Sequence, residues 1–350
     1  MNNRQINIFI LAAGRGERLR PITDSIPKPL VPLLGRPALE YILDGLTGLP
    51  YKKIGINLHH RKEDMGKWAA GHPLREKMIL FYEDEVLGTG GALKKAGEFL
   101  GSATFLVHNS DILSDIDLED LLETHRTTGN LVTLAVHDEQ KFNSLLIDDR
   151  GCLLKVLNSQ DDPSHAARPP VRILAFTGIA VYEPAFLAFL PEGRSGVVEA
   201  WTEAARAGHA VGTFDVTGCS WTDIGTPVAY AAAVFDALRK EGEVIYLHRS
   251  VENCGYIDLK RNVVLEQGCH VRERVKLRNC IVLPGGTVPP PPSLTTGWQT
   301  GDTSENCIVG PGFVIPLSER DVILSDTEGR QLIGTGGSDR RYYRTTWEGG

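Results

Sequence analysis

Residues 6–21 read INIFILAAGRGERLRP, and this stretch contains the feature that decides the fold. A compact apolar run, Ile6–Leu11, leads through two alanines into Gly14 and Gly16, which are followed by arginines. The run is too short to span a bilayer and is typical of a buried strand. Glycines let backbone N–H groups approach an anion closely, and arginines supply the opposing charge. We therefore predict a strand that ends in a phosphate-binding turn, with a purely structural tight turn as the alternative.

Strand-like and helix-like stretches alternate through the first 240 residues. Further strands are expected at residues 53–58, 104–107, 131–136 and 173–181. Helices are expected at residues 37–46, 92–100, 118–127, 198–207 and 226–240, and a loop at residues 161–170. This alternation predicts an α/β fold with a mostly parallel, Rossmann-like sheet and helices on both faces. Ligands bind such sheets at the carboxyl ends of strands, where Gly14 and Asp111 are expected to lie.

The pattern changes after residue 240, where apolar residues recur every six positions. One series comprises Ile257, Val263, Cys269, Val275, Ile281 and Thr287, and a second comprises Leu259, Leu265, Val271, Leu277 and Leu283. A six-residue period is typical of a β-helix, in which each unit supplies one short face of a coil. We predict a short, degenerate left-handed β-helix-like domain over residues 245–318, with an ordinary β-meander as the alternative.

The composition restricts the possible classes of protein. The chain has 350 residues, 42% of them hydrophobic and 23% charged, which is typical of a folded globular protein. Its net charge of −7 argues against nonspecific binding to nucleic acid or anionic membranes. The N-terminal sequence resembles neither a leader peptide nor a membrane span, so we expect a cytoplasmic protein. The six cysteines form no Cys-x-x-Cys pair and are expected to be buried thiols.

Several motifs in a fixed order resemble sugar-1-phosphate nucleotidyltransferases, also called nucleotide-sugar pyrophosphorylases. They are Gly14-x-Gly16-x-Arg18, Pro27-Lys28-Pro29, Leu87-Gly-Thr-Gly-Gly-Ala92, Asn109-Ser-Asp111, Thr177-Gly-Ile179 and Trp221-Thr-Asp-Ile-Gly225. The resemblance covers residues 6 to about 240 and implies that residues 1–240 form a nucleotidyltransferase catalytic domain. Such an enzyme transfers a nucleotidyl group from a nucleoside triphosphate to a hexose 1-phosphate, releasing pyrophosphate and forming an NDP-sugar.

The resemblance also implies roles for individual residues. Arg18 would hold the β- and γ-phosphates, and Lys28 would bridge the α-phosphate and the sugar phosphate. Asp111 and Asp223 would bind Mg²⁺ together, since this ion prefers oxygen ligands. The implied nucleotide site contains Ala12, Ala13, Gly14, Gly16, Glu83, Gly88, Thr89 and Gly90. The implied sugar site contains Asn143, Thr177 and Gly178. The structural alternatives are a solvated loop lysine and helix-capping aspartates.

The sequence leaves the substrates open, because the sugar-side motifs depart from the usual pattern. The family's Glu-Lys-Pro motif is missing near residues 155–165, and Phe142-Asn143 stands where Tyr-Gly is usual. These departures favour an N-acetylmuramate or N-acetylglucosamine 1-phosphate uridylyltransferase, whereas residues 87–89 and 109–111 favour a mannose-1-phosphate guanylyltransferase. The alternative function is a noncatalytic subunit that senses nucleotide sugars or serves assembly, and the repeats leave a homo-oligomer open.

The C-terminal tail carries a separate resemblance. Residues 333–344, IGTGGSDRRYYR, resemble the glycine-rich opening of aminoglycoside-phosphotransferase-like sugar kinases. We hypothesise that the tail, residues 319–350, is the beginning of a kinase domain, fused or encoded nearby, that makes the sugar 1-phosphate. A flexible glycine-rich tail is the alternative.

Overall fold

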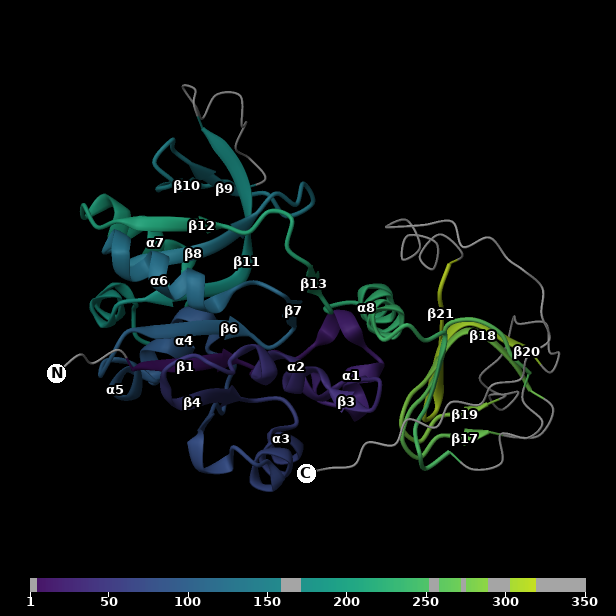
Figure 1. The fold of residues 1–350 in the computed structure, drawn as a ribbon. Coiled ribbons are helices and arrows are strands. Elements are labelled where there is room, and N and C mark those ends of the chain that lie inside the picture. The colour runs from purple at the N-terminus through teal and green to yellow at the C-terminus, as the bar shows by residue number, and fades with distance from the viewer. Residues whose placement is uncertain (1–4, 159–170, 252–257, 272–274, 289–302, 319–350) are drawn as a thin grey trace. The chain divides into compact units, whose positions relative to one another are not determined.

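The computed structural model describes residues 5–158, 171–251, 258–271, 275–288 and 303–318 (Figure 1). The chain divides into two compact units. The first contains the residues up to 17 together with 26–30 and 38–223, and the second contains 18–25, 31–37 and the residues from 224 on. The loop expected at residues 161–170 and the kinase-like tail lie outside the described residues.

A nine-stranded sheet forms the centre of the first unit, in the order β10-β9-β11-β6-β1-β4-β5, with β8 paired to β11 and β12 paired to β8. The predicted strand β1 (Ile6–Leu11) pairs in parallel with both β4 (Tyr51–Leu58) and β6 (Phe105–Asn109). The other strands are β5 (Met78–Tyr82), β8 (Val132–His137), β9 (Leu145–Ile147), β10 (Leu153–Val156), β11 (Arg172–Tyr182) and β12 (Val211–Asp215). Strand β11 runs antiparallel to both β6 and β8, which makes the sheet mixed around its parallel centre.

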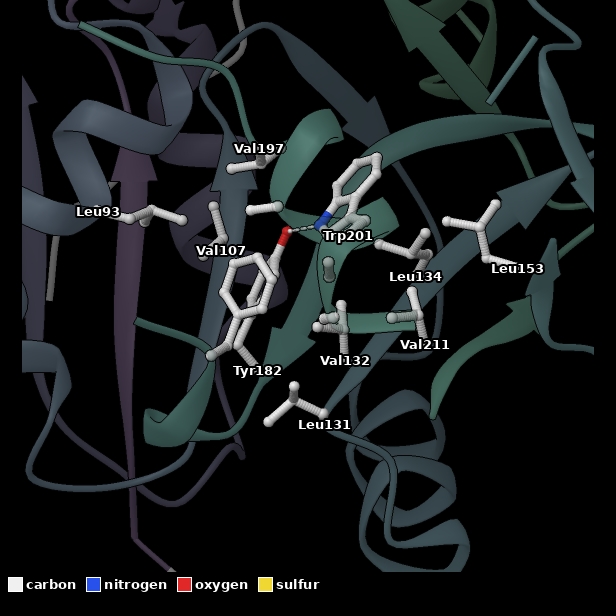
Figure 2. Packing of buried hydrophobic residues seen from close by; sticks show 14 of the residues in the cluster. Leu93, Val107, Leu131, Val132, Leu134, Leu153, Tyr182, Val197, Trp201 and Val211 are labelled. Carbon is white, nitrogen blue, oxygen red and sulfur yellow. Dashed lines mark hydrogen bonds between the residues drawn. The ribbon is translucent and has the colours of Figure 1, made fainter. Parts of the chain in front are cut away.

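Helices cover both faces of this sheet, because alternate side chains of the central strands point in opposite directions. Phe9 packs into a buried cluster with residues of α4 (Gly88–Lys95), α5 (Gly97–Leu100) and α7 (Val198–Arg206). Ile8 and Ile10 pack into another cluster, with residues of α2 (Ala38–Gly45), α3 (Lys62–Gly71) and α6 (Leu118–Thr128). Figure 2 shows the first cluster, where the indole of Trp201 donates a hydrogen bond of 3.3 Å to the hydroxyl of Tyr182. The predicted α/β architecture is therefore confirmed.

Short elements complete the first unit and carry parts of the candidate site. Strand β7 (Ile112–Ser114) pairs with β13 (Trp221–Asp223) in a separate two-stranded sheet. The 3₁₀ helices are η1 (Glu17–Leu19, at the boundary between the units), η2 (Lys28–Leu30), η3 (Arg75–Lys77) and η4 (Pro184–Phe189). The single helix expected at residues 92–100 is two helices, α4 and α5, which meet at Ala96.

In the second unit, α1 (Ile22–Ser25) precedes a hairpin of β2 (Pro32–Leu33) and β3 (Arg36–Pro37), and α8 (Pro227–Lys240) follows an N-cap at Thr226. Parallel neighbours then form a sheet: β14 (Ile245–Leu247), β16 (Val263–Leu265), β18 (Lys276–Val282) and β20 (Thr303–Gly310). The remaining strands are β15 (Asp258–Leu259), β17 (His270–Val271), β19 (Thr287–Val288) and β21 (Phe313–Pro316).

The six-residue period has a structural counterpart in this parallel sheet. Ile245 pairs with Val263 and Val263 with Cys280, so successive strands are separated by about three of the six-residue units. At one position of the sheet, Asn262 donates a side-chain hydrogen bond to Asn279, which donates in turn to Asn306. All three asparagines adopt the left-handed backbone conformation that this residue tolerates. The stacked strands follow the six-residue period only in part, because Leu259 pairs with Leu277, whereas Val263 pairs with Cys280 and not with Ile281.

Two further expectations concern the cysteines and membranes. Cys269, Cys280 and Cys307 are buried in the second unit, as predicted, but Cys219 is exposed in the turn before β13, and Cys152 is partly exposed. Cys254 lies outside the described residues. The prediction of buried thiols was therefore wrong for Cys219, because a turn has no apolar layer to cover it.

Among the described helices, none combines the length and apolar character needed to cross a bilayer.

Candidate active site

The turn after β1 is braced by a chain of buried polar groups. The backbone N–H of Ala12 donates to Asn57 Oδ1 at 2.7 Å, and Asn57 Nδ2 donates to Glu83 Oε1 at 2.8 Å. The other carboxylate oxygen of Glu83 accepts the backbone N–H of Leu87 at 3.0 Å. Glu83 is only 1% exposed, so its charge depends on these internal bonds. Glu83 therefore braces the glycine-rich segment, and its place in the nucleotide site stays a prediction.

The turn itself leaves room for a ligand. Ala13 is buried, whereas Gly14 is exposed. A Cβ atom added to Gly14 would meet no atom within 4 Å, and the residue does not adopt the left-handed conformation. Neither packing nor a left-handed backbone therefore requires glycine at this position, and the space beside Gly14 is open to a ligand. Gly16, in contrast, has a φ of 65° that favours glycine.

The glycine-rich segment at the start of α4 packs against another part of the backbone. A Cβ atom on Gly90 would lie 2.3 Å from the carbonyl oxygen of Gly196, and the N–H of Gly90 donates to the carbonyl of Ser195 at 2.9 Å. The hydroxyl of Thr89 accepts the N–H of Val197 at 3.2 Å. Gly88 has a φ of 73°, which again favours glycine. These residues were predicted as nucleotide contacts. The structure shows that the small glycines also allow the backbone of residues 193–197 to pack against them, and the sequence did not indicate this packing.

Two distant aspartates come together through strand pairing. Asp111 immediately precedes β7, and Asp223 ends β13. The antiparallel register of these strands places Asp223 opposite Ile112, the residue after Asp111. Lys28, the first residue of η2, forms a direct ion pair with Asp111 and lies 4.0 Å from Asp223, measured from Nζ to Oδ1. Three motifs separated by most of the first unit therefore meet at one point.

The electrostatics of this point suit a divalent cation. The side chains of Lys28, Asp111 and Asp223 are 12%, 23% and 18% exposed, so water screens their charges only in part. Two carboxylates beside a single ammonium leave a net negative charge, and carboxylate oxygens are the ligands that Mg²⁺ prefers. Within the described residues, no cluster of three or more His, Cys, Asp or Glu side chains could hold a metal. The donor set therefore fits an ion that completes its shell with substrate phosphates and water.

The predicted sugar-site residues bond mainly within the protein. The hydroxyl of Thr177 is fully buried and donates to the carbonyl of Ala135 at 2.9 Å. Asn143 uses its side chain to accept the N–H of Glu139 and to donate to Asp138. Both side chains therefore have structural hydrogen bonds, and their contact with a sugar stays a prediction.

Gly178 lies near the aspartate pair for a different reason. It has a φ of 88°, and a Cβ atom there would lie 2.8 Å from Asn109 Nδ2, at the end of β6. The register of β11 shifts between Phe176 and Ala180, which places this bend beside the strand that leads to Asp111. Gly178 therefore permits close packing at the site, and its contact with a sugar stays a prediction.

His137, Phe142 and Trp221 form an aromatic cluster near Asp223 that the sequence analysis did not predict. The ring of Trp221 lies 4.5 Å from that of His137 and 5.8 Å from that of Phe142, measured between centroids. Its indole N–H donates to the carbonyl of Thr177 at 2.8 Å, which fixes the ring. Burial lowers the pKa of His137 below its ordinary value, so this imidazole is neutral at physiological pH. Trp221 was quoted only as part of a motif, although its position two residues before Asp223 could have indicated this surface.

Arg18 lies in the exposed helix η1 and belongs to the second compact unit. Its predicted contact with the β- and γ-phosphates therefore stays a prediction.

Comparison with known proteins shows the family of this chain. A model of the nucleotidyl transferase family matches residues 8–240. A UTP–glucose-1-phosphate uridylyltransferase from Synechocystis is 29% identical over 255 residues, which cover 67% of this chain and 63% of that protein. A mannose-1-phosphate guanylyltransferase from Mycobacterium tuberculosis is 30% identical over 247 residues, covering 68% and 66%. The chain thus matches slightly less than two thirds of the length of these relatives.

Solved structures show the same fold. A glucose-1-phosphate thymidylyltransferase described as putative, from Bacillus anthracis, superposes with a TM-score of 0.56 at 20% identity, covering 66% of this chain and 95% of that chain. HddC from Yersinia pseudotuberculosis, in complex with GMP-PN, gives 0.53 at 22% identity, covering 68% and 100%. Because the family model covers about two thirds of the sequence and includes Lys28, Asp111 and Asp223, this chain belongs to the nucleotidyl transferase family.

Proposed function

We propose that this chain transfers a nucleotidyl group from a nucleoside triphosphate to a hexose 1-phosphate, releasing pyrophosphate and forming an NDP-sugar. The observation that carries the proposal is the meeting of Lys28, Asp111 and Asp223 at one point of the first unit. The named relatives act on glucose 1-phosphate and mannose 1-phosphate, which supports a sugar phosphate as the acceptor.

The chemistry needs positioning and charge neutralisation more than proton transfer. An oxygen of the sugar phosphate attacks the α-phosphorus, and the bond from this phosphorus to the bridging oxygen of pyrophosphate breaks. The attacking oxygen is already anionic, so no general base is required. Lys28 stabilises the charge shared between the α-phosphate and the sugar phosphate, and Arg18 is proposed to hold the leaving pyrophosphate. Asp111 and Asp223 would hold Mg²⁺, which when bound neutralises phosphate charge.

The turn after β1 and the glycine-rich segment would bind the nucleotide. Exposed backbone at Gly14 offers an approach to the triphosphate, and the brace through Asn57 and Glu83 keeps Ala12 and the start of α4 in a fixed geometry. Rigid positioning of this kind lowers the entropy cost of bringing the reactants together. We propose that the aromatic surface of Trp221 and Phe142 receives the apolar face of the sugar ring.

For the two substrates we propose two alternative pairs, a smaller set than the family as a whole uses. Uridylyl transfer to N-acetylmuramate or N-acetylglucosamine 1-phosphate and guanylyl transfer to mannose 1-phosphate remain the proposed reactions. One named relative uses UTP, and another is a guanylyltransferase, which supports retaining both bases.

For the second unit, we propose a β-helix-like domain over residues 245–318 that assembles a homo-oligomer. The parallel register of β14, β16, β18 and β20 supports the coil-like arrangement. A fused or neighbouring sugar kinase is proposed from the sequence of residues 333–344 alone.

The test is pyrophosphate release, measured for each common nucleoside triphosphate against N-acetylmuramate, N-acetylglucosamine, mannose and glucose 1-phosphates. We expect Mg²⁺-dependent turnover for at least one pair, and its abolition in Asp223→Asn. A noncatalytic sensing subunit would instead bind nucleotide or NDP-sugar with no pyrophosphate release for any pair. Glu203→Gln, which changes an exposed carboxylate of α7, is the matched control and should retain full activity.

A further inference from the structure

The hairpin that follows Lys28 has an unusual turn. Helix η2 (Lys28–Leu30) leads within one residue into β2, and the β2–β3 turn consists of Leu34 and Gly35. Their φ angles are 51° and 80°, so both residues adopt the left-handed conformation. A leucine pays a free-energy cost there, and such strain persists only where the surroundings fix it. The groups that fix this turn are therefore informative.

A buried carboxylate holds the turn. Glu266, which directly follows β16, accepts the backbone N–H of Gly35 on Oε2 at 2.9 Å and also accepts a hydrogen bond from the backbone of Leu34. Glu266 is 1% exposed, and its other oxygen, Oε1, has no hydrogen-bond partner among the described residues. Burial raises the pKa of Glu266 to about 7. Burying a carboxylate this fully costs free energy, and hydrogen bonds from the two adjacent backbone amides of Leu34 and Gly35 offset part of that cost.

Neighbouring groups of the same compact unit restrict the hairpin further. The hydroxyl of Tyr230, on α8, is fully buried and donates to the carbonyl of Pro32 at 2.6 Å. A Cβ atom on Gly35 would lie 2.1 Å from the hydroxyl oxygen of Tyr246, on β14, so glycine is required at this position. The described groups that hold the hairpin therefore include three side chains that come after residue 224.

We infer that Glu266 is a positioning residue for Lys28, because it holds in its strained conformation the hairpin into which the Lys28 segment runs. The C-terminal region would then contribute to the geometry of catalysis and not to assembly alone. This inference rests on the proposed function only where its test measures kcat and KM. A displacement of about 1 Å in a catalytic group can lower a rate by up to about 10²-fold, so anchoring this segment has a functional value.

The test compares Glu266→Ala, Glu266→Gln and the control Glu305→Gln, which removes an exposed carboxylate from β20 of the same unit. Hydrogen exchange is followed in the peptide that spans residues 28–37, and kcat and KM are measured with saturating Mg²⁺. We expect exchange in the hairpin to rise at least about tenfold in Glu266→Ala, since charge-assisted bonds to two amides are lost. We expect kcat to fall about tenfold with a smaller change in KM, because Lys28 acts mainly on the transition state.

Glu266→Gln keeps one acceptor oxygen and the volume of the side chain, so it should fall between wild type and Glu266→Ala in both measurements. Glu305→Gln should match wild type. Unchanged exchange in residues 28–37 of either folded Glu266 variant would overturn the inference. Increased exchange with unchanged kcat would also overturn it, since Glu266 would then be structural only. If the wild-type protein releases no pyrophosphate, the proposed function fails, while the exchange data still decide whether Glu266 holds the hairpin.

Discussion

Replacement of Lys28 by methionine tests the shared environment of the two aspartates. The substitution keeps an unbranched side chain one atom shorter and removes its charge, leaving Asp111 and Asp223 without the neighbouring ammonium group. Loss of one partner from a buried ion pair costs about 3–5 kcal/mol, and the partial exposure of these side chains reduces this to about 2–3 kcal/mol. At about 2–4 °C for each kcal/mol in a domain of this size, the expected fall in Tm is about 5–10 °C.

Mg²⁺ should reverse most of this loss. A cation that binds only the folded protein stabilises it by about 2.7 kcal/mol at a concentration of 100 times its Kd. In the variant, the two carboxylates no longer have the ammonium as a competitor, so Mg²⁺ should raise Tm more in Lys28→Met than in wild type. The kcat of pyrophosphate release should nevertheless fall by at least about 10²-fold, or about 2.7 kcal/mol.

The assay is thermal unfolding in chelator and in saturating Mg²⁺, together with kcat from pyrophosphate release. The control is Lys62→Met, which removes an ion pair to the exposed Asp84 and should leave Tm, its response to Mg²⁺ and kcat unchanged. Equal Tm values for Lys28→Met and wild type in chelator, or equal gains in Mg²⁺, would refute the assignment of Lys28 to the same carboxylates as the cation. An unchanged kcat would refute its catalytic role.

Three further substitutions probe the turn, the glycine-rich segment and the second unit. Gly14→Ala should raise the KM for the nucleotide without lowering Tm, because the new methyl group would meet no protein atom and would occupy space proposed for the triphosphate. In the control Gly97→Ala the methyl group also meets no protein atom but lies outside the proposed site, so KM should stay the same and Tm should not fall. Gly90→Ala should lower the free energy of unfolding by about 1–3 kcal/mol in denaturant titrations, since its methyl group would overlap the carbonyl of Gly196. The pKa of Glu266 is raised from 4.5 to about 7, so between these pH values the folded protein holds a proton that the unfolded chain has lost. The contribution of Glu266 to the free energy of unfolding therefore falls as the pH rises from about 4.5 to about 7. Glu266→Gln should abolish that part of the pH dependence of unfolding, and an identical pH profile would contradict it.

Much of the first unit could be predicted from local patterns. The apolar run Ile6–Leu11 is buried between parallel neighbours, and its alternation of Phe9 with Ile8 and Ile10 fills clusters on both faces. Lys28, Asp111 and Asp223 could be brought together before the structure only by the resemblance of their motifs to a family. Composition and periodicity do not encode the register between β7 and β13 that unites the two aspartates.

Other features of the site depend on contacts between segments far apart in sequence, and no local sequence pattern predicts such contacts. The packing of residues 193–197 against Gly90 could not be foreseen, and it is compatible with the predicted nucleotide contact. The bonds of the Glu83 carboxylate to Asn57 and Leu87 inside the protein could not be foreseen either. The left-handed Leu34 departs from the usual preference of leucine, and the buried carboxylate of Glu266, more than two hundred residues later, bonds to this turn.

The central claim is that Asp111 and Asp223 hold one divalent cation against a bound triphosphate. The most direct measurement is Mn²⁺ binding, followed by electron paramagnetic resonance in the presence of nucleoside triphosphate, for wild type, Asp111→Asn, Asp223→Asn and the double variant. Each single substitution should weaken binding by at least about tenfold, and the double variant should lose little more, because both carboxylates serve a single ion. Wild-type affinity in either single variant, or losses that add as they do for independent sites, would contradict the claim.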